Sequence, residues 1–76
     1  MYRILIVDDE VEIADLIEVY LRNEDYEVLK FYTAKEALAC MKNTPVDLAI
    51  LDVMLPDGDG FSLMQQLRTF TNVAII

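Results

Sequence analysis

Residues 3–10 read RILIVDDE, a run of aliphatic side chains that ends in three consecutive acids. A continuous aliphatic run fits a central strand of a parallel sheet, because helices cover both faces of such a strand. Residues 47–52, DLAILD, repeat the pattern, and the run again ends in an acid, Asp52. The two stretches therefore predict two central strands that each carry aspartate to their carboxyl end.

The segment after the first strand has the pattern of an amphipathic helix. Asp9, with Glu12 three positions later, predicts a capping box at its start. The acids between its apolar residues are interpreted as a solvated face. The apolar residues recur at helical spacing: Ile13, Leu16, Ile17, Tyr20 and Leu21.

A second strand and a second helix follow. Residues 26–31 alternate in polarity, which predicts a strand near the edge of the sheet. Thr33 and Glu36 form a second capping-box pattern, and residues 43–45, NTP, end the helix that this pattern opens.

The last part of the chain completes an alternating order of strands and helices. Residues 53–60 are rich in Pro, Asp and Gly and predict a loop. A third helix ends at Asn72, and residues 73–76, VAII, begin a fourth strand. The order β-α-β-α-β-α-β predicts an α/β fold, a parallel sheet with right-handed crossovers and helices on both faces. Apolar residues at helical spacing mark the third helix: Phe61, Met64 and Leu67.

Composition limits the classes of function. A chain of 76 residues is at most one domain, and a hydrophobic fraction of 55% argues against disorder. The net charge of −8 disfavours binding of this segment to DNA, and no apolar run reaches the ~20 residues of a membrane span. Histidine is absent, and the lone Cys40 predicts a small buried hydrophobe. Without a signal-peptide pattern, we expect a soluble, cytoplasmic protein.

The strand-end acids predict a site. If the first and third strands are neighbours, Asp8, Asp9 and Asp52 meet at the carboxyl edge of the sheet. Clustered carboxylates repel one another and need a counter-ion, and oxygen ligands without Cys or His favour Mg²⁺. A carboxylate beside that cation can attack phosphorus and form an aspartyl phosphate.

Each candidate also has a purely structural interpretation. Asp9 can be a helix N-cap, and Asp52 can be a solvated acid at a strand end. Asp57 and Asp59 are most simply a solvated loop residue and a helix cap. The aromatic residues are most simply packing residues: Tyr20, Tyr26, Phe31, Tyr32 and Phe61.

These motifs, taken together, resemble a response-regulator receiver domain of two-component systems. The match consists of the acidic pair after the first strand, then Asp52, Pro56 and Gly60 in register, and it covers all 76 residues. The details are similar to the branch of transcription factors with a winged-helix output domain. Within it, the stretches YTAKEAL and DLAILD are similar to vancomycin-resistance-type regulators.

The resemblance implies a role for each site residue. Asp52 would accept a phosphoryl group from a histidine kinase. For the acidic face of the first helix, contact with that kinase is the alternative to a purely solvated face. Asp9 and Asp52 would bind Mg²⁺ directly, Asp8 directly or through water, and the backbone carbonyl of Met54 would complete the ligands. The domain would be a signalling switch and not an enzyme, and DNA would be bound only through a separate output domain.

The chain also departs from the family pattern. Residues 1–76 would form the N-terminal part of a receiver domain of the flavodoxin-like class, with strand order 2-1-3-4. The fifth strand, the last two helices, a Ser or Thr after the fourth strand and a Lys after the fifth would be missing. An aliphatic edge strand at residues 73–76 predicts that the truncated chain self-associates through its fourth strand or third helix, or is only partly folded.

Two other classes of function stay open at this point. One is a Mg²⁺-dependent phosphohydrolase with an Asp nucleophile, although Met54 stands where such enzymes place a second Asp. The other is an interaction module whose binding ignores Mg²⁺.

Overall fold

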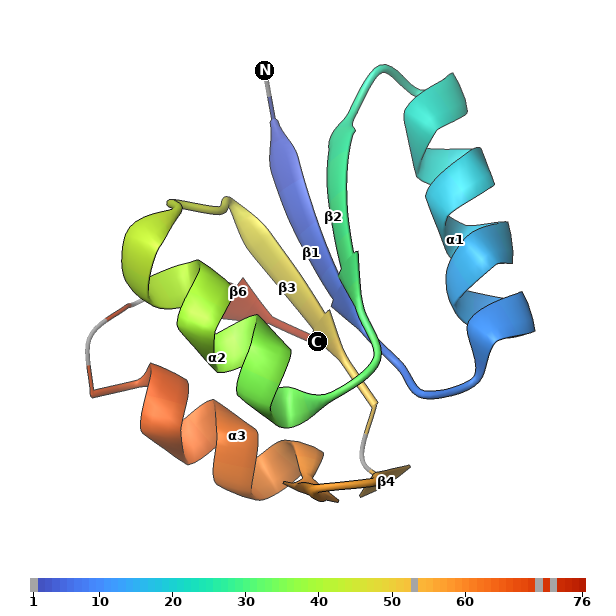
Figure 1. Ribbon diagram of the computed structural model, residues 1–76. Helices are drawn as coiled ribbons and strands as arrows, with labels where there is room; N and C mark the ends of the chain where they lie inside the picture. Colours follow the sequence, from blue (N-terminus) through green and yellow to red (C-terminus); the bar gives the residue numbers. More distant parts are fainter. Residues whose placement is uncertain (1, 53, 70, 72) are drawn as a thin grey trace.

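The computed structural model describes residues 2–52, 54–69, 71 and 73–76. Four strands form one parallel sheet in the order β2-β1-β3-β6. Because β6 is the predicted fourth strand, the predicted order 2-1-3-4 is confirmed. Along the chain the elements are β1 (Arg3–Val7), α1 (Val11–Asn23), β2 (Glu27–Phe31), α2 (Ala34–Asn43), β3 (Leu48–Leu51), β4 (Met54–Leu55), β5 (Gly58–Asp59), α3 (Gly60–Leu67) and β6 (Ala74–Ile75) (Figure 1).

The sheet separates two apolar layers, with α1 on one face and α2 with α3 on the other (Figure 1). Ile4 and Ile6 of β1 pack with Ala14 of α1, whereas Leu5 and Val7 face the layer of α2 and α3. Neighbouring residues of a strand point to opposite faces, so one aliphatic run serves both layers. The four β1 residues are at most 2% exposed, which confirms β1 as a central strand.

The predicted capping patterns had different outcomes. Thr33 caps α2, since its hydroxyl accepts a hydrogen bond from the Glu36 amide at 3.2 Å, as predicted. The Asp9–Glu12 capping box is wrong: α1 begins at Val11, its N-cap residue is Glu10, and no side chain caps it. The carboxylate of Asp9 lies with other acids at the sheet edge and not over the helix end.

The buried face of α1 also differs from the prediction. Ala14 is fully buried, and Ile17 and Leu21 pack beside it on the sheet. Leu16 and Tyr20 are 71% and 67% exposed, so their predicted packing role is wrong. The small side chain of Ala14 lets the helix pack closely on the sheet. The larger side chains of Leu16 and Tyr20 lie on a different side of the helix and face solvent.

The other aromatic residues divide between packing and exposure. Phe61 is 62% exposed, because the buried face of α3 is made by Leu63 and Leu67 on the other side of the helix. Tyr26 packs against Tyr2, with ring centroids 5.5 Å apart. The remaining two aromatic predictions are confirmed by partly buried packing against the layers: Phe31 and Tyr32.

Residues 54–59 form a short hairpin and not the predicted loop. Met54 pairs with Asp59 and Leu55 with Gly58, antiparallel. Gly58 has a φ of 155°, a backbone conformation that residues with a Cβ atom rarely adopt, so the tight turn favours glycine. Leu55 is buried in the layer of α2 and α3 and anchors the hairpin there.

The third helix ends at Leu67, before the predicted break at Asn72, which lies outside the described residues. Among the residues that the structure describes, none of the helices is long and apolar enough to cross a membrane.

Candidate metal and phosphoryl-acceptor site

Two of the predicted site residues lie directly after neighbouring strands. The Asp8 amide donates to the Phe31 carbonyl at 3.1 Å, and the Asp52 amide donates to the Val7 carbonyl at 2.8 Å. These bonds continue the β1–β2 and β1–β3 ladders by one residue. Both aspartates are therefore fixed at the carboxyl edge of the sheet, as the alternation of strands and helices predicted.

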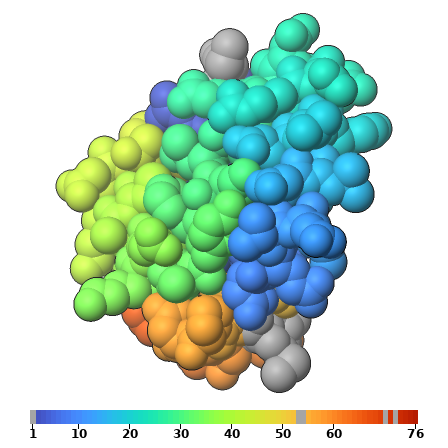
Figure 2. All heavy atoms as spheres, turned by 45° about the vertical axis from the view of Figure 1, so that its right-hand side comes forward, coloured from blue at the N-terminus to red at the C-terminus, as the bar shows by residue number. Residues whose placement is uncertain are grey.

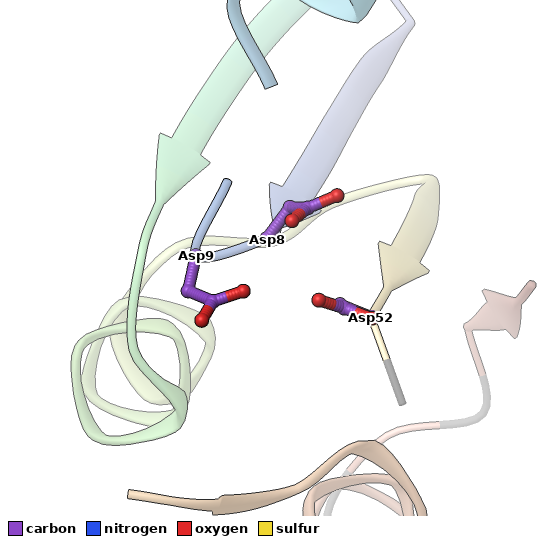
Figure 3. Close-up of side chains that lie close together, drawn as sticks. All are labelled: Asp8, Asp9 and Asp52. Carbon is purple, nitrogen blue, oxygen red and sulfur yellow. The ribbon is translucent and has the colours of Figure 1, made fainter. Parts of the chain in front are cut away.

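The three predicted carboxylates converge at that edge. Asp8, Asp9 and Asp52 each offer an oxygen atom, and these oxygens lie within 4.8 Å of one another. In Figure 3 the carboxylates of Asp9 and Asp52 point toward one another across a gap, with Asp8 beside it. Asp8 and Asp52 are half-buried and Asp9 is exposed. Residues far apart in the sequence thus form a single acidic cluster.

Burial and charge act together on Asp8. Its pKa is raised first by burial, which disfavours the charged carboxylate, and then by the charge of Asp52, a side-chain hydrogen bond with Asp52 and the charge of Asp9. The Glu10 amide opposes this, because it donates to Asp8 Oδ1 at 2.9 Å and lowers the pKa. The cluster therefore favours any species that brings positive charge between the carboxylates.

The cluster fits a magnesium ion in size and chemistry. Mg²⁺ prefers oxygen ligands at ~2.1 Å, so two ligands on opposite sides of the ion lie ~4.2 Å apart. The three carboxylate oxygens lie within 4.8 Å of one another, so they are close enough to approach a single ion. Ligation by these three residues stays a prediction.

The hairpin after Asp52 supplies the remaining candidates. Met54 begins β4, two residues beyond Asp52, and the role of its carbonyl as a ligand stays a prediction. Asp59 caps α3 by accepting a hydrogen bond from the Ser62 amide at 2.6 Å, as predicted. Asp57, predicted as a solvated loop residue, is bonded to the first amides of α2, a contact without a local sequence signal.

Comparison with known proteins assigns the chain and its fold to a family. A family model of the response regulator receiver domain matches residues 4–76. The chain therefore belongs to the receiver domains of two-component response regulators, which confirms the resemblance seen in its motifs. It is similar to the regulatory protein VanR of Enterococcus faecium, with 61% identity over 66 residues, which is 87% of this chain and 29% of VanR.

Solved structures agree with this assignment. A two-component response regulator from Clostridium difficile has a TM-score of 0.96 and 27% identity, over 99% of this chain and 62% of that one. The response regulator TrrA of Thermotoga maritima, solved in complex with Mg²⁺ and BeF, has a TM-score of 0.93 and 34% identity, over 99% of this chain and 66% of that one. TrrA has also been solved in complex with the histidine kinase ThkA. The chain spans less than a third of the length of VanR.

Proposed function

We propose that Asp52 accepts a phosphoryl group from a histidine kinase, at a Mg²⁺ site formed by Asp8, Asp9, Asp52 and the carbonyl of Met54. The observation that carries the proposal is the convergence of carboxylates from two separate strands within 4.8 Å. The Mg²⁺ in the TrrA structure and the complex of TrrA with its kinase support the cation and the partner.

The surroundings favour Asp52 over its neighbours as the acceptor. Asp9 is exposed, whereas Asp52 is half-buried. Asp52 directly follows the central strand β3 and also borders a largely apolar hollow of about 110 Å³ beside Gly60 of α3. The strand hydrogen bond of the Asp52 amide fixes the backbone of this residue beside the hollow.

The transfer needs little more from the chain than position and charge. A carboxylate oxygen of Asp52 attacks phosphorus, and the bond from phosphorus to the donor nitrogen breaks, with its electron pair leaving on the donor imidazole. A bound Mg²⁺ would offset the negative charge of the carboxylates and of the phosphoryl oxygens. Asp8 and Asp9 would bind the ion and so keep its positive charge beside Asp52.

The wider role is also part of the proposal. Since the chain spans 29% of VanR, we propose that residues 1–76 form the N-terminal part of a receiver domain in a longer transcription regulator. Phosphorylation would then control DNA binding by an output domain outside this segment. The cytoplasmic location predicted from the sequence stays a prediction.

Phosphorylation of the full-length protein by a small acyl phosphate tests the proposal. With Mg²⁺ present, mass spectrometry should detect one added phosphoryl group, and none after chelation. Asp52→Asn should abolish the addition, because an amide is a poor nucleophile. Asp59→Asn is the matched control, since asparagine keeps the helix cap of α3 while removing an equal charge. Equal labelling of Asp52→Asn and wild type would exclude Asp52 as the acceptor.

A further inference from the structure

Asp57 lies in the turn of the β4–β5 hairpin and reaches a different part of the chain. Its Oδ1 accepts a hydrogen bond from the Ala34 amide at 2.9 Å and its Oδ2 one from the Lys35 amide at 3.0 Å. The partners lie 23 and 22 residues earlier in the sequence. Both amides belong to the first turn of α2, where backbone N–H groups have no partner within the helix.

The two bonds use both oxygens of the carboxylate, so they fix its direction as well as its position. A carboxylate at a helix N-terminus is also stabilised by the helix dipole. In agreement, the pKa of Asp57 is lowered, first by the hydrogen bond from Ala34 and then by that from Lys35. Figure 2 shows orange atoms of this part of the chain against green atoms at the start of α2.

The hairpin needs such support. Each of its strands has two residues, and an isolated two-stranded hairpin is marginally stable at best. Leu55 anchors one strand in the apolar layer, and Asp59 joins the other to α3. Asp57 adds the connection to α2. The hairpin begins at Met54, two residues after Asp52, so its placement sets where the Met54 carbonyl lies.

We propose that Asp57 is a positioning residue for the metal site: by tying the hairpin to the first turn of α2, it holds the Met54 backbone at the carboxylate cluster. The inference rests on the proposed Mg²⁺ site and adds to it a contact from another element. Residues that orient metal ligands typically change metal affinity by ~10–100-fold when mutated. Asp57 acts through the backbone of the hairpin, so we expect the lower end, a loss of about 10-fold.

Mg²⁺ affinity of the full-length protein, measured by calorimetry, tests the inference. Asp57→Ala should weaken Mg²⁺ binding about 10-fold, and Asp57→Asn should recover part of it, because an amide oxygen can accept one of the two bonds. In phosphorylation by an acyl phosphate, the Mg²⁺ concentration for half-maximal rate should rise while the maximal rate at saturating Mg²⁺ stays near wild type.

Thr33→Ala is the matched control. It removes the local cap of α2 at the Glu36 amide and leaves the hydrogen bonds from the Ala34 and Lys35 amides to Asp57 in place. Wild-type Mg²⁺ affinity in Thr33→Ala, with reduced affinity in Asp57→Ala, supports the inference. Equal losses in both variants would show that stability of α2 alone matters, and unchanged affinity in Asp57→Ala and Asp57→Asn would overturn the positioning role while leaving the proposed function intact. If the wild type itself binds no Mg²⁺, the proposed function fails and the inference with it.

Discussion

Replacing Asp52 by asparagine should stabilise the protein when magnesium is absent, although it removes the proposed phosphoryl acceptor. The substitution keeps the size and the backbone of the side chain. It removes one of three negative charges whose oxygens lie within 4.8 Å of one another. Relief of this repulsion should appear as a higher free energy of unfolding.

The size of the gain follows from the spacing of the charges. Two unit charges 4.8 Å apart repel by about 0.9 kcal/mol in water and about 3.5 kcal/mol at an effective dielectric constant of ~20. Asp9 is exposed and Asp8 and Asp52 are only half-buried, so solvent screening favours the lower figure. Asp52 has two such neighbours, and solvent screens both pairs. We therefore expect a gain of about 1 kcal/mol.

Urea denaturation of the full-length protein, followed by circular dichroism with and without Mg²⁺, measures this gain. A ligand that binds only the folded state at 100 times its dissociation constant stabilises it by about 2.7 kcal/mol. Wild type should gain this amount from Mg²⁺ and Asp52→Asn much less, so the order of stability reverses on adding the ion. Asp59→Asn, which keeps its helix cap, should respond to Mg²⁺ as wild type does. An Asp52→Asn variant that is less stable than wild type in chelator would refute the repulsion argument, and an equal response to Mg²⁺ would remove Asp52 from the metal site.

Three further predictions follow from other parts of the structure. Asp57 has a lowered pKa in the folded protein, so its contribution to stability should be complete above the unfolded-state pKa of ~3.9 and should disappear as the pH falls through the folded-state pKa. In acid unfolding, Asp57→Asn should lack this pH-dependent loss of stability. Leu5→Ala should cost about 3 kcal/mol in urea denaturation because Leu5 is fully buried, whereas Leu16→Ala at an exposed site should change the free energy of unfolding by less than ~0.5 kcal/mol. The 76-residue chain produced alone should self-associate, since Ile76 after β6 is 75% exposed. Burying ~300 Å² of apolar surface on association gives about 7 kcal/mol, against an association cost of ~4–15 kcal/mol. A strictly monomeric species in sedimentation, with a sharp thermal melt, would contradict this prediction.

The sheet and the acidic cluster were predictable because their signals are strong and local. An uninterrupted aliphatic run is required wherever both faces of a strand are covered, and β1 and β3 both have one. The position of Asp8 and Asp52 directly after those runs then determines the edge at which they meet. The prediction had to assume that the two strands are neighbours in the sheet, and the parallel pairing of β1 with β3 confirms this.

The buried face of α1 was predicted only in part, with Ile17 and Leu21 correct, because the apolar residues surround most of the helix. A stripe through Leu16 and Tyr20 matches the helical period as well as the observed stripe through Ala14 and Leu21. The choice depends on which row fits the sheet, and the small Ala14 permits the closer approach. The contacts of Asp57 were missed for a related reason, since capping rules describe neighbours in sequence and its partners lie 22 and 23 residues away.

The arrangement of the sheet explains how the protein can keep three mutually repelling carboxylates together. The Asp8 and Asp52 backbones continue the ladders of β1, and β1 is buried between an apolar layer on each face. The ends of β1 and β3 therefore cannot move apart without breaking strand hydrogen bonds and exposing both apolar layers. This costs far more than the repulsion of about 1 kcal/mol per pair of carboxylates. Because the backbone holds the three residues together, a proton or a cation at the cluster relieves the repulsion. In the proposed Mg²⁺ site, rigidity at the end of the central strands would thus turn an unfavourable cluster of charges into affinity for a divalent ion, and the hairpin tied to α2 and α3 would bring the remaining ligand to it.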